Sequence, residues 1–240
     1  MTSTEVPASK PNSLQRIIGV LIAPNETFAS IVRQPDWVVP LVIILVISLI
    51  AGIVFAQRVD FASGMREAME QNKNLQPDQI DRMVRISSGV AKVFAYCSPV
   101  LSAIILLIVA GALLLVFRLF GGEGDFRQAF SVTVYAWMPG IIKSIIITAI
   151  IAVRTVSLND LAILVRSNLA FLVTMKEHPM LFTLLSSLDV FTFWLLALLV
   201  IGFSYVSKFS RSKSAAIVIS LWVIVTLVKL IGPAIRALRG

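Results

Sequence analysis

The sequence VVPLVIILVISLIAGIVFA, Val38–Ala56, contains no charged residue. A bilayer core roughly 30 Å thick is crossed by about 20 apolar residues in an α-helix. A backbone in lipid has to satisfy its own hydrogen bonds, and a closed barrel would need strands of alternating polarity, which this stretch lacks. The stretch is therefore predicted to be a membrane-spanning helix.

Four further stretches along the chain have the same character. The chain is 58% hydrophobic and 14% charged, with a mean hydropathy of +0.90, whereas soluble domains are closer to half apolar and a quarter charged. The predicted fold is all-α: a polytopic membrane protein with a five-helix transmembrane bundle over residues 36–236. The predicted spans are Val38–Ala56, Val93–Phe117, Ala129–Val153, Leu188–Ser207 and Ala215–Ile235. The fourth span has an alternative start near Met180.

Two polar segments precede the first span. Residues 1–12 are predicted to form a disordered tail without a cleavable signal peptide. Residues 13–35 are predicted to form interfacial amphipathic helices. In the first helix, Leu14, Ile17, Ile18 and Leu21 recur at helical spacing, with Gln15 and Arg16 off that face. Pro24 begins a second short helix, which Pro35 ends.

Residues 57–92 form the longest connection between the predicted spans. Pro77 suits the first turn of a helix, and Ile80, Met83 and Val84 share one face. The segment is predicted to be an extramembrane loop of two amphipathic helices over the mouth of the bundle. A solvated loop without such helices is the alternative.

The net charge of +8 narrows the possible partners. Basic residues beside apolar runs indicate contact with anionic lipid headgroups, and the absence of zinc-finger or RNA-binding signatures argues against nucleic acid. One cysteine, Cys97, and one histidine, His178, make no metal set, so no cofactor is predicted, and Cys97 is expected to be buried. The short loop Lys208–Lys213 carries three bases, which favours a cytoplasmic N-terminus. Bases at the opposite side, near the C-terminus, leave the other orientation open.

Two charges fall inside the predicted spans. Lys143 lies eleven residues before Arg154, about 16 Å from that helix end. Asp189 lies about 12–14 Å deep if its helix starts near Met180, or at the interface if the helix starts at Leu188. Because a charge at mid-membrane costs about 2.5–3.5 kcal/mol on insertion scales, the two residues are predicted to pair. The alternative is that Lys143 reaches the surface and Asp189 stays there, as Lys229 is expected to do.

Turn and packing signals mark three further places. The sequence GGEGDF, residues 121–126, is neither a dinucleotide nor a phosphate-loop pattern and is predicted to be a tight reversal with positive φ at glycine. Pro139 is expected to kink the third span. Ser48 with Gly52, and Ala136 with Gly140, have the spacing of close helix contacts. No hydrolase motif is present, so no catalytic activity is predicted.

Several of these residues, in this order, resemble the Yip family, membrane proteins named for their interaction with Ypt/Rab GTPases, and its bacterial members most. The motif residues are Pro24, Thr27, Phe28, Pro35, Trp37, Pro40, Gly121, Gly122, Gly124, Phe126, Tyr135, Ala136, Pro139, Asp189, Phe191 and Trp194. The resemblance implies five spans, a cytoplasmic N-terminus and a multi-pass location, here the bacterial cytoplasmic membrane. Eukaryotic relatives are linked to vesicle transport, Rab recruitment and membrane shaping.

Together these observations favour a non-enzymatic membrane scaffold or interaction protein. Its partners would be the lipid bilayer and either a second membrane protein or another copy of the chain. The alternative function is a small transporter or permease subunit, in which Lys143 and Asp189 would line a polar path through the membrane.

Overall fold

The computed structural model describes residues 12–70, 75–175 and 177–239. The predicted N-terminal tail therefore lies outside the described residues, except for Asn12. Within the described part of the chain, five helical segments are long and apolar enough to cross a membrane, which confirms the predicted fold class. They are α3 (Val38–Arg58), α6 (Ser98–Leu119), α7 with α8 (Phe126–Val153), α10 (Val190–Ser207) and Arg211–Ile235 of α11 (Arg211–Arg239).

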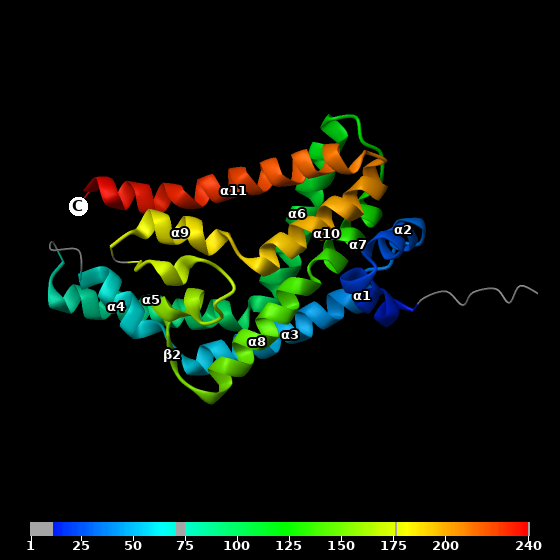
Figure 1. Cartoon of the computed structure of the whole chain (residues 1–240). Coiled ribbons are helices and arrows are strands. Elements are labelled where there is room, and N and C mark those ends of the chain that lie inside the picture. The colour runs from blue at the N-terminus through cyan, green and yellow to red at the C-terminus, as the bar shows by residue number, and fades with distance from the viewer. Residues whose placement is uncertain (1–11, 71–74, 176, 240) are drawn as a thin grey trace, which may run out of the picture.

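The bundle has two distinct ends (Figure 1). Helices α1 (Ser13–Ile22) and α2 (Pro24–Arg33) lie at one end, called here the N-terminal end. The opposite end holds α4 (Phe61–Glu70), α9 (Pro179–Ser187) and the end of α11, with most of α5 (Pro77–Tyr96). Two-residue strands β1 (Val59–Asp60) and β2 (Val156–Ser157) pair in parallel there, followed by the 3₁₀ turns η1 (Leu158–Ile163) and η2 (Ala170–Leu172).

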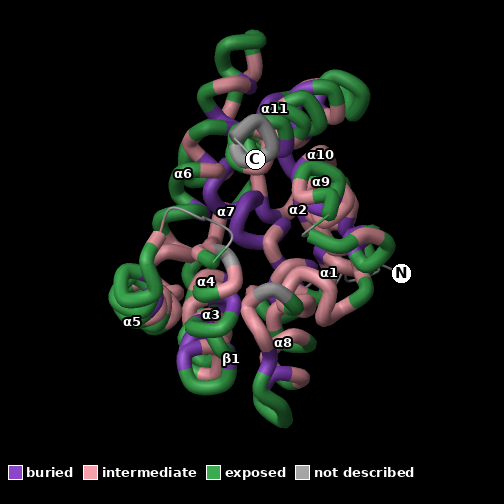
Figure 2. Tube along the Cα trace, turned by 90° about the vertical axis from the view of Figure 1, so that its left-hand side faces the viewer, coloured by how far each residue is buried: buried purple, intermediate pink, exposed green. Residues whose placement is uncertain are grey.

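The centre of the bundle is α7 (Phe126–Ala136), which is buried from Ala129 to Ala136 (Figure 2). It is enclosed by α2, α6 and α10. A Cβ atom added at Gly202 of α10 would lie 2.2 Å from the Val132 side chain. Glycine therefore permits α10 to approach α7 closely, as small residues do in membrane helix packing.

Helices α1 and α2 contribute side chains to the core of the bundle. Val20, Phe28 and Ile31 are fully buried in the cluster that contains α7 and α10. The lipid- or solvent-facing stripe of α1 is Leu14, Ile18 and Ile22, at i, i+4 and i+8. Of the face predicted from the sequence, Ile17 and Leu21 pack inward instead.

The third span is interrupted where the sequence predicts a kink. Helix α7 ends at Ala136, and α8 (Met138–Val153) begins after Trp137 with Pro139 in its first turn. Proline lacks an amide N–H, so it fits the start of a helix better than its interior.

The second span starts later than predicted. Helix α5 runs to Tyr96, and a break at Cys97 precedes α6, which has Pro99 in its first turn. The residues from Val93 to Tyr96 therefore belong to α5. Cys97 at this break is exposed, so the expectation that it is buried is wrong.

Small residues bring α3 against the break between α5 and α6. The Ser98 hydroxyl donates a hydrogen bond to the Ser48 carbonyl at 2.7 Å. A Cβ at Gly52 would lie 2.0 Å from the Ala95 carbonyl oxygen. The predicted Ser48–Gly52 pair is therefore a close contact, whereas a Cβ at Gly140 would meet nothing nearer than 3.8 Å.

The connection after α3 contains two helices, α4 and α5, which pack together. The Gln76 and Gln79 side chains form a capping box at the start of α5, and Pro77 lies in its first turn. Ile80 and Val84 are buried on the predicted face, while Met83 is 42% exposed.

Candidate functional site

Asp189 lies between α9 and α10, at the point where the chain begins its fourth span. The residue has extended backbone angles and caps α10: its Oδ1 accepts hydrogen bonds from the Phe191 amide at 2.9 Å and the Thr192 amide at 3.3 Å. Aspartate is favoured at this position because its oxygen satisfies free amides and its charge opposes the positive helix end. The fourth span therefore begins at Val190, and α9 is a separate helix.

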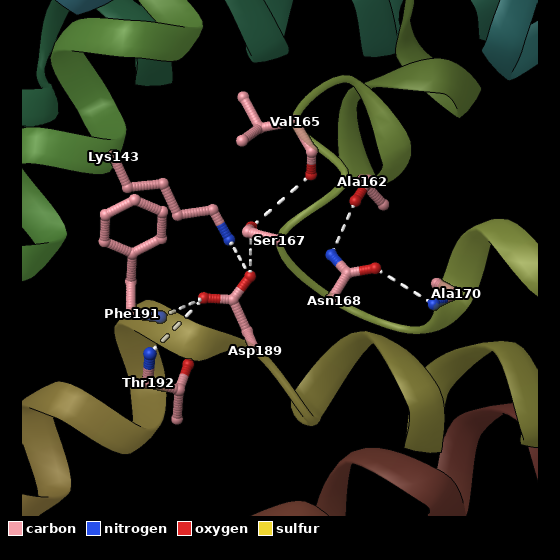
Figure 3. A network of polar contacts seen from close by, with 9 residues as sticks. All are labelled: Lys143, Ala162, Val165, Ser167, Asn168, Ala170, Asp189, Phe191 and Thr192. Carbon is pink, nitrogen blue, oxygen red and sulfur yellow. Dashed lines mark hydrogen bonds and ion pairs between the residues drawn. The ribbon is translucent and has the colours of Figure 1, made fainter.

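The second oxygen of Asp189 joins two further segments (Figure 3). Oδ2 accepts hydrogen bonds from Lys143 Nζ at 2.7 Å and from the Ser167 hydroxyl at 2.5 Å. The Asp189 side chain is 2% exposed and that of Lys143 27%. Lys143 lies ten residues before the end of α8, about 15 Å along the helix. The structure thus brings together the two charges that the sequence singled out, with Lys143 held by the acid rather than extended to the surface.

The loop that supplies Ser167 is itself fixed against the start of α10. The Val190 amide donates to the Ser167 carbonyl at 2.9 Å. The Asn168 side chain donates to the Ala162 carbonyl at 2.8 Å and accepts from the Ala170 amide at 3.0 Å. Ser167 and Asn168 were not predicted, because single polar residues in a loop carry no periodic signal.

The chemistry available to this cluster follows from its hydrogen-bond count. An ionised carboxylate has about four acceptor sites, and four donors from Lys143, Ser167, Phe191 and Thr192 surround Asp189. The carboxylate therefore acts as an acceptor that connects α8, the 164–170 loop and α10. Among the described residues, no three His, Cys, Asp or Glu side chains come together as a metal site. His178 and Lys229 are both exposed.

A second polar cluster lies at the N-terminal end. Arg16 is 5% exposed, and its Nη1 lies 3.0 Å from Asp36 Oδ1. Asp36 also accepts hydrogen bonds from the Tyr135 hydroxyl and the Ser13 hydroxyl, both at 2.8 Å. Arg16 Nη1 donates to the Gln34 carbonyl at 2.9 Å. Together these contacts attach α1 to α7 and to the start of α3.

Sequence reasoning missed this cluster because it treated Arg16 as part of an exposed polar face. The sequence feature that could have indicated this cluster is Asp36, a carboxylate directly before the first span. A carboxylate at the edge of an apolar stretch requires a partner, as Asp189 does. In the structure that partner is Arg16 of α1.

The motif residues have structural roles in several parts of the fold, and Tyr135 is the one that donates to Asp36. Trp37 meets Phe130 edge-on, with ring centroids 5.5 Å apart, and Phe126 stacks on Phe130 at 5.8 Å. Phe28 is fully buried in the apolar core that contains α7 and α10, and Trp194 packs against that core. Gly121 and Gly124 have φ values of 85° and 100°, which confirms the predicted reversal, while a Cβ at Gly122 would lie 2.8 Å from the Phe117 carbonyl oxygen. Pro24 begins α2, and Phe191 donates its amide to Asp189.

A family model described as Yip1 domain matches residues 18–232. The chain belongs to the Yip1 domain family. The comparisons with curated proteins and with solved structures gave no match. The matched region of this Yip-family protein includes all five candidate spans except the last residues of the fifth, and it contains the Lys143–Asp189 cluster and most of the N-terminal one. Membership and the five apolar helices together make the chain a multi-pass membrane protein associated with a lipid bilayer.

Proposed function

We propose that this Yip-family chain is a non-catalytic membrane scaffold that organises the bilayer or recruits a partner. The observation that carries the proposal is the saturation of the Asp189 carboxylate by four donors, three of them from the polypeptide around α10 and one from Lys143. A proton carrier or substrate ligand needs acceptor capacity that a reaction or a solute can use. A carboxylate whose acceptor sites are filled by its own chain is better suited to holding helices together.

The surface of α1 supports an interaction role. Leu14, Ile18 and Ile22 are 58%, 59% and 77% exposed, in one stripe along a helix whose other side is anchored in the core. Such a stripe buries its area only in lipid or against another protein. We infer that α1 is the element through which the scaffold contacts a leaflet or a partner.

We propose that the N-terminal end faces the cytoplasm, and the charge distribution supports this orientation. Exposed basic residues gather at this end from four helices and the loop before α11: Arg33, Arg118, Arg127, Lys208, Arg211 and Lys213. Exposed acids there include Glu26, Glu123 and Asp125, so the balance is positive. Short loops with excess lysine and arginine favour the cytoplasmic side.

The experiment is affinity capture of the full chain in mild detergent, with identification of bound proteins and lipids. Replacing Leu14, Ile18 and Ile22 together by Ser removes the stripe without touching Val20. The matched control replaces Val42 and Val46 of α3, which are also exposed apolar residues, by Ser. The proposal expects the α1 variant, and not the control, to lose associated proteins or lipids while the protein stays folded in the membrane. Recovery of the same proteins and lipids in equal amounts with the wild type and with the α1 variant would refute the proposal.

A further inference from the structure

An apolar groove of about 500 Å³ lies between α10 and α11. Ala197 and Val200 of α10 and Ile219 of α11 line its walls, and Arg211 lies among its lining residues at the start of α11. Phe193 and Trp222 line the other end, with ring centroids 5.9 Å apart. The groove is therefore apolar along its length and cationic at one end.

The length of the groove matches one leaflet. Arg211 and Trp222 are eleven residues apart on α11, about 16 Å along the helix, and half of a hydrocarbon core is about 15 Å. Arg211 lies at the basic N-terminal end, so the groove runs from headgroup level to the middle of the bilayer. Tryptophan usually lies at the interface, whereas Trp222 is half-buried at the deep end of this groove.

Arg211 retains hydrogen-bonding capacity toward the groove. One Nη2 hydrogen bond goes to Asn25 Oδ1 at 2.7 Å, and the guanidinium lies over the Tyr205 ring, 5.1 Å from its centroid. A guanidinium has five N–H donors, and no described carboxylate forms an ion pair with this one. Its planar fork fits the paired oxygens of a phosphate.

We propose that the groove binds one anionic phospholipid, with an acyl chain between α10 and α11 and the phosphate on Arg211. A volume of about 500 Å³ is in the range of small-ligand sites. The groove lies between two helices that pack against each other, so it suits a single narrow acyl chain better than a further helix about 10 Å wide. The site is separate from the Lys143–Asp189 cluster and from the exposed stripe of α1.

The test uses the full chain in phosphatidylcholine nanodiscs that contain a minor fraction of phosphatidylglycerol. Native mass spectrometry measures how many lipids of each kind the released protein retains. Two variants address the site: Arg211→Gln removes the charge, and Ala197→Phe fills the groove. Two matched controls lie outside it: Arg33→Gln removes an exposed charge at the same end, and Ala216→Phe enlarges an exposed alanine of α11 that does not line the groove.

Wild type is expected to retain one phosphatidylglycerol in preference to phosphatidylcholine. Arg211→Gln should lower that preference about fivefold, since one basic residue near the membrane surface attracts anionic lipid by about that factor. Ala197→Phe should abolish retention of the lipid, and both controls should behave as wild type. An equal loss with Arg33→Gln would show diffuse attraction and overturn the proposal, as would a lipid-free dimer whose formation Ala197→Phe prevents.

A second measurement tests the proposal if Ala197→Phe fails to fold. The contribution of Trp222 to the protein's fluorescence is the part that is missing from Trp222→Phe. Phosphatidylglycerol with brominated acyl chains should quench this contribution, and brominated phosphatidylcholine should quench it less. Equal quenching by the two lipids would contradict a charge-selective site.

Discussion

Replacing Lys143 by Met is expected to destabilise the protein more than replacing Lys143 and Asp189 together. The single change leaves a carboxylate that is 2% exposed without its counter-charge. Breaking a buried ion pair by removing one partner costs about 3–5 kcal/mol, whereas replacing both partners by uncharged groups is often close to neutral. The partner variant Asp189→Asn keeps an oxygen that can cap α10. It therefore measures the loss of the charge without the loss of the cap.

The magnitudes follow from the contacts. Lys143→Met removes one of the four donors on Asp189 and leaves three, so a loss of about 3 kcal/mol is expected, at the lower end of the range for a broken pair. Asp189→Asn removes the charge but leaves an amide oxygen that can still accept the Lys143 hydrogen bond, so about 1–2 kcal/mol is expected. The double variant should lose only about 1–2 kcal/mol, which corresponds to a coupling free energy of about 2–4 kcal/mol.

The assay is equilibrium unfolding of the full chain in mixed micelles as the fraction of dodecyl sulfate rises. The four proteins of the cycle are compared at one pH and lipid content, with Lys229→Met as a control for loss of an exposed lysine from a span. The control should unfold with wild type. Additive losses in the double variant would refute the reasoning, because additivity is the signature of residues that do not interact.

Two further predictions concern backbone contacts. Gly52→Ala would place a Cβ 2.0 Å from the Ala95 carbonyl oxygen and should destabilise by about 1–3 kcal/mol, while Gly89→Ala, where nothing lies within 4 Å, should be neutral or stabilise by up to about 1 kcal/mol in the same unfolding assay. The Ser63 amide donates to Asp60 and holds the pKa of that carboxyl below its ordinary value of 3.8, so this contact stabilises α4 at neutral pH and is lost as the pH falls below about 4. Lower protection factors for the α4 amides at low pH, after correction for the pH dependence of the intrinsic exchange rate, would show the loss. Asp60→Asn should remove this pH dependence, and protection factors that are unaffected by acid would contradict the prediction.

The spans were predictable because long uncharged runs leave few alternatives in lipid. Val38–Ala56 differs from α3 by two residues at one end. The breaks between helices were harder to predict, because a proline indicates where a helix starts but not whether the preceding residues are helical. Pro99 lies in the first turn of α6, yet α5 remains helical to Tyr96. A hydropathy run cannot separate two helices joined at one residue.

The candidate site was predictable in part for a different reason. A charge in an apolar stretch is conspicuous, so Lys143 and Asp189 could be singled out and proposed as a pair from the sequence. The depth predicted for Asp189 rested on a helix that starts near Met180, whereas the fourth span starts at Val190. Ser167 could not be found, since it lies in a loop whose path depends on the pairing. Arg16 was assigned to the wrong environment because helical periodicity identifies faces but not which face meets the protein.

The two buried clusters have a common construction that relates packing to the proposed role. Asp36 and Asp189 each precede a span, and each is held by a cation and a hydroxyl from other segments: Arg16 and Tyr135 for one, Lys143 and Ser167 for the other. In lipid, an apolar side chain gains little free energy when it leaves an acyl chain to contact another helix. Polar contacts and close packing therefore determine which helices are neighbours. The Asp36 cluster attaches α1 to the bundle at the end where its apolar stripe is exposed, and the Asp189 cluster holds α8 against α10 deep in the fold. The proposed scaffold role requires a rigid bundle behind the exposed stripe of α1. The two clusters provide that rigidity with side chains that a transport path would have to leave free.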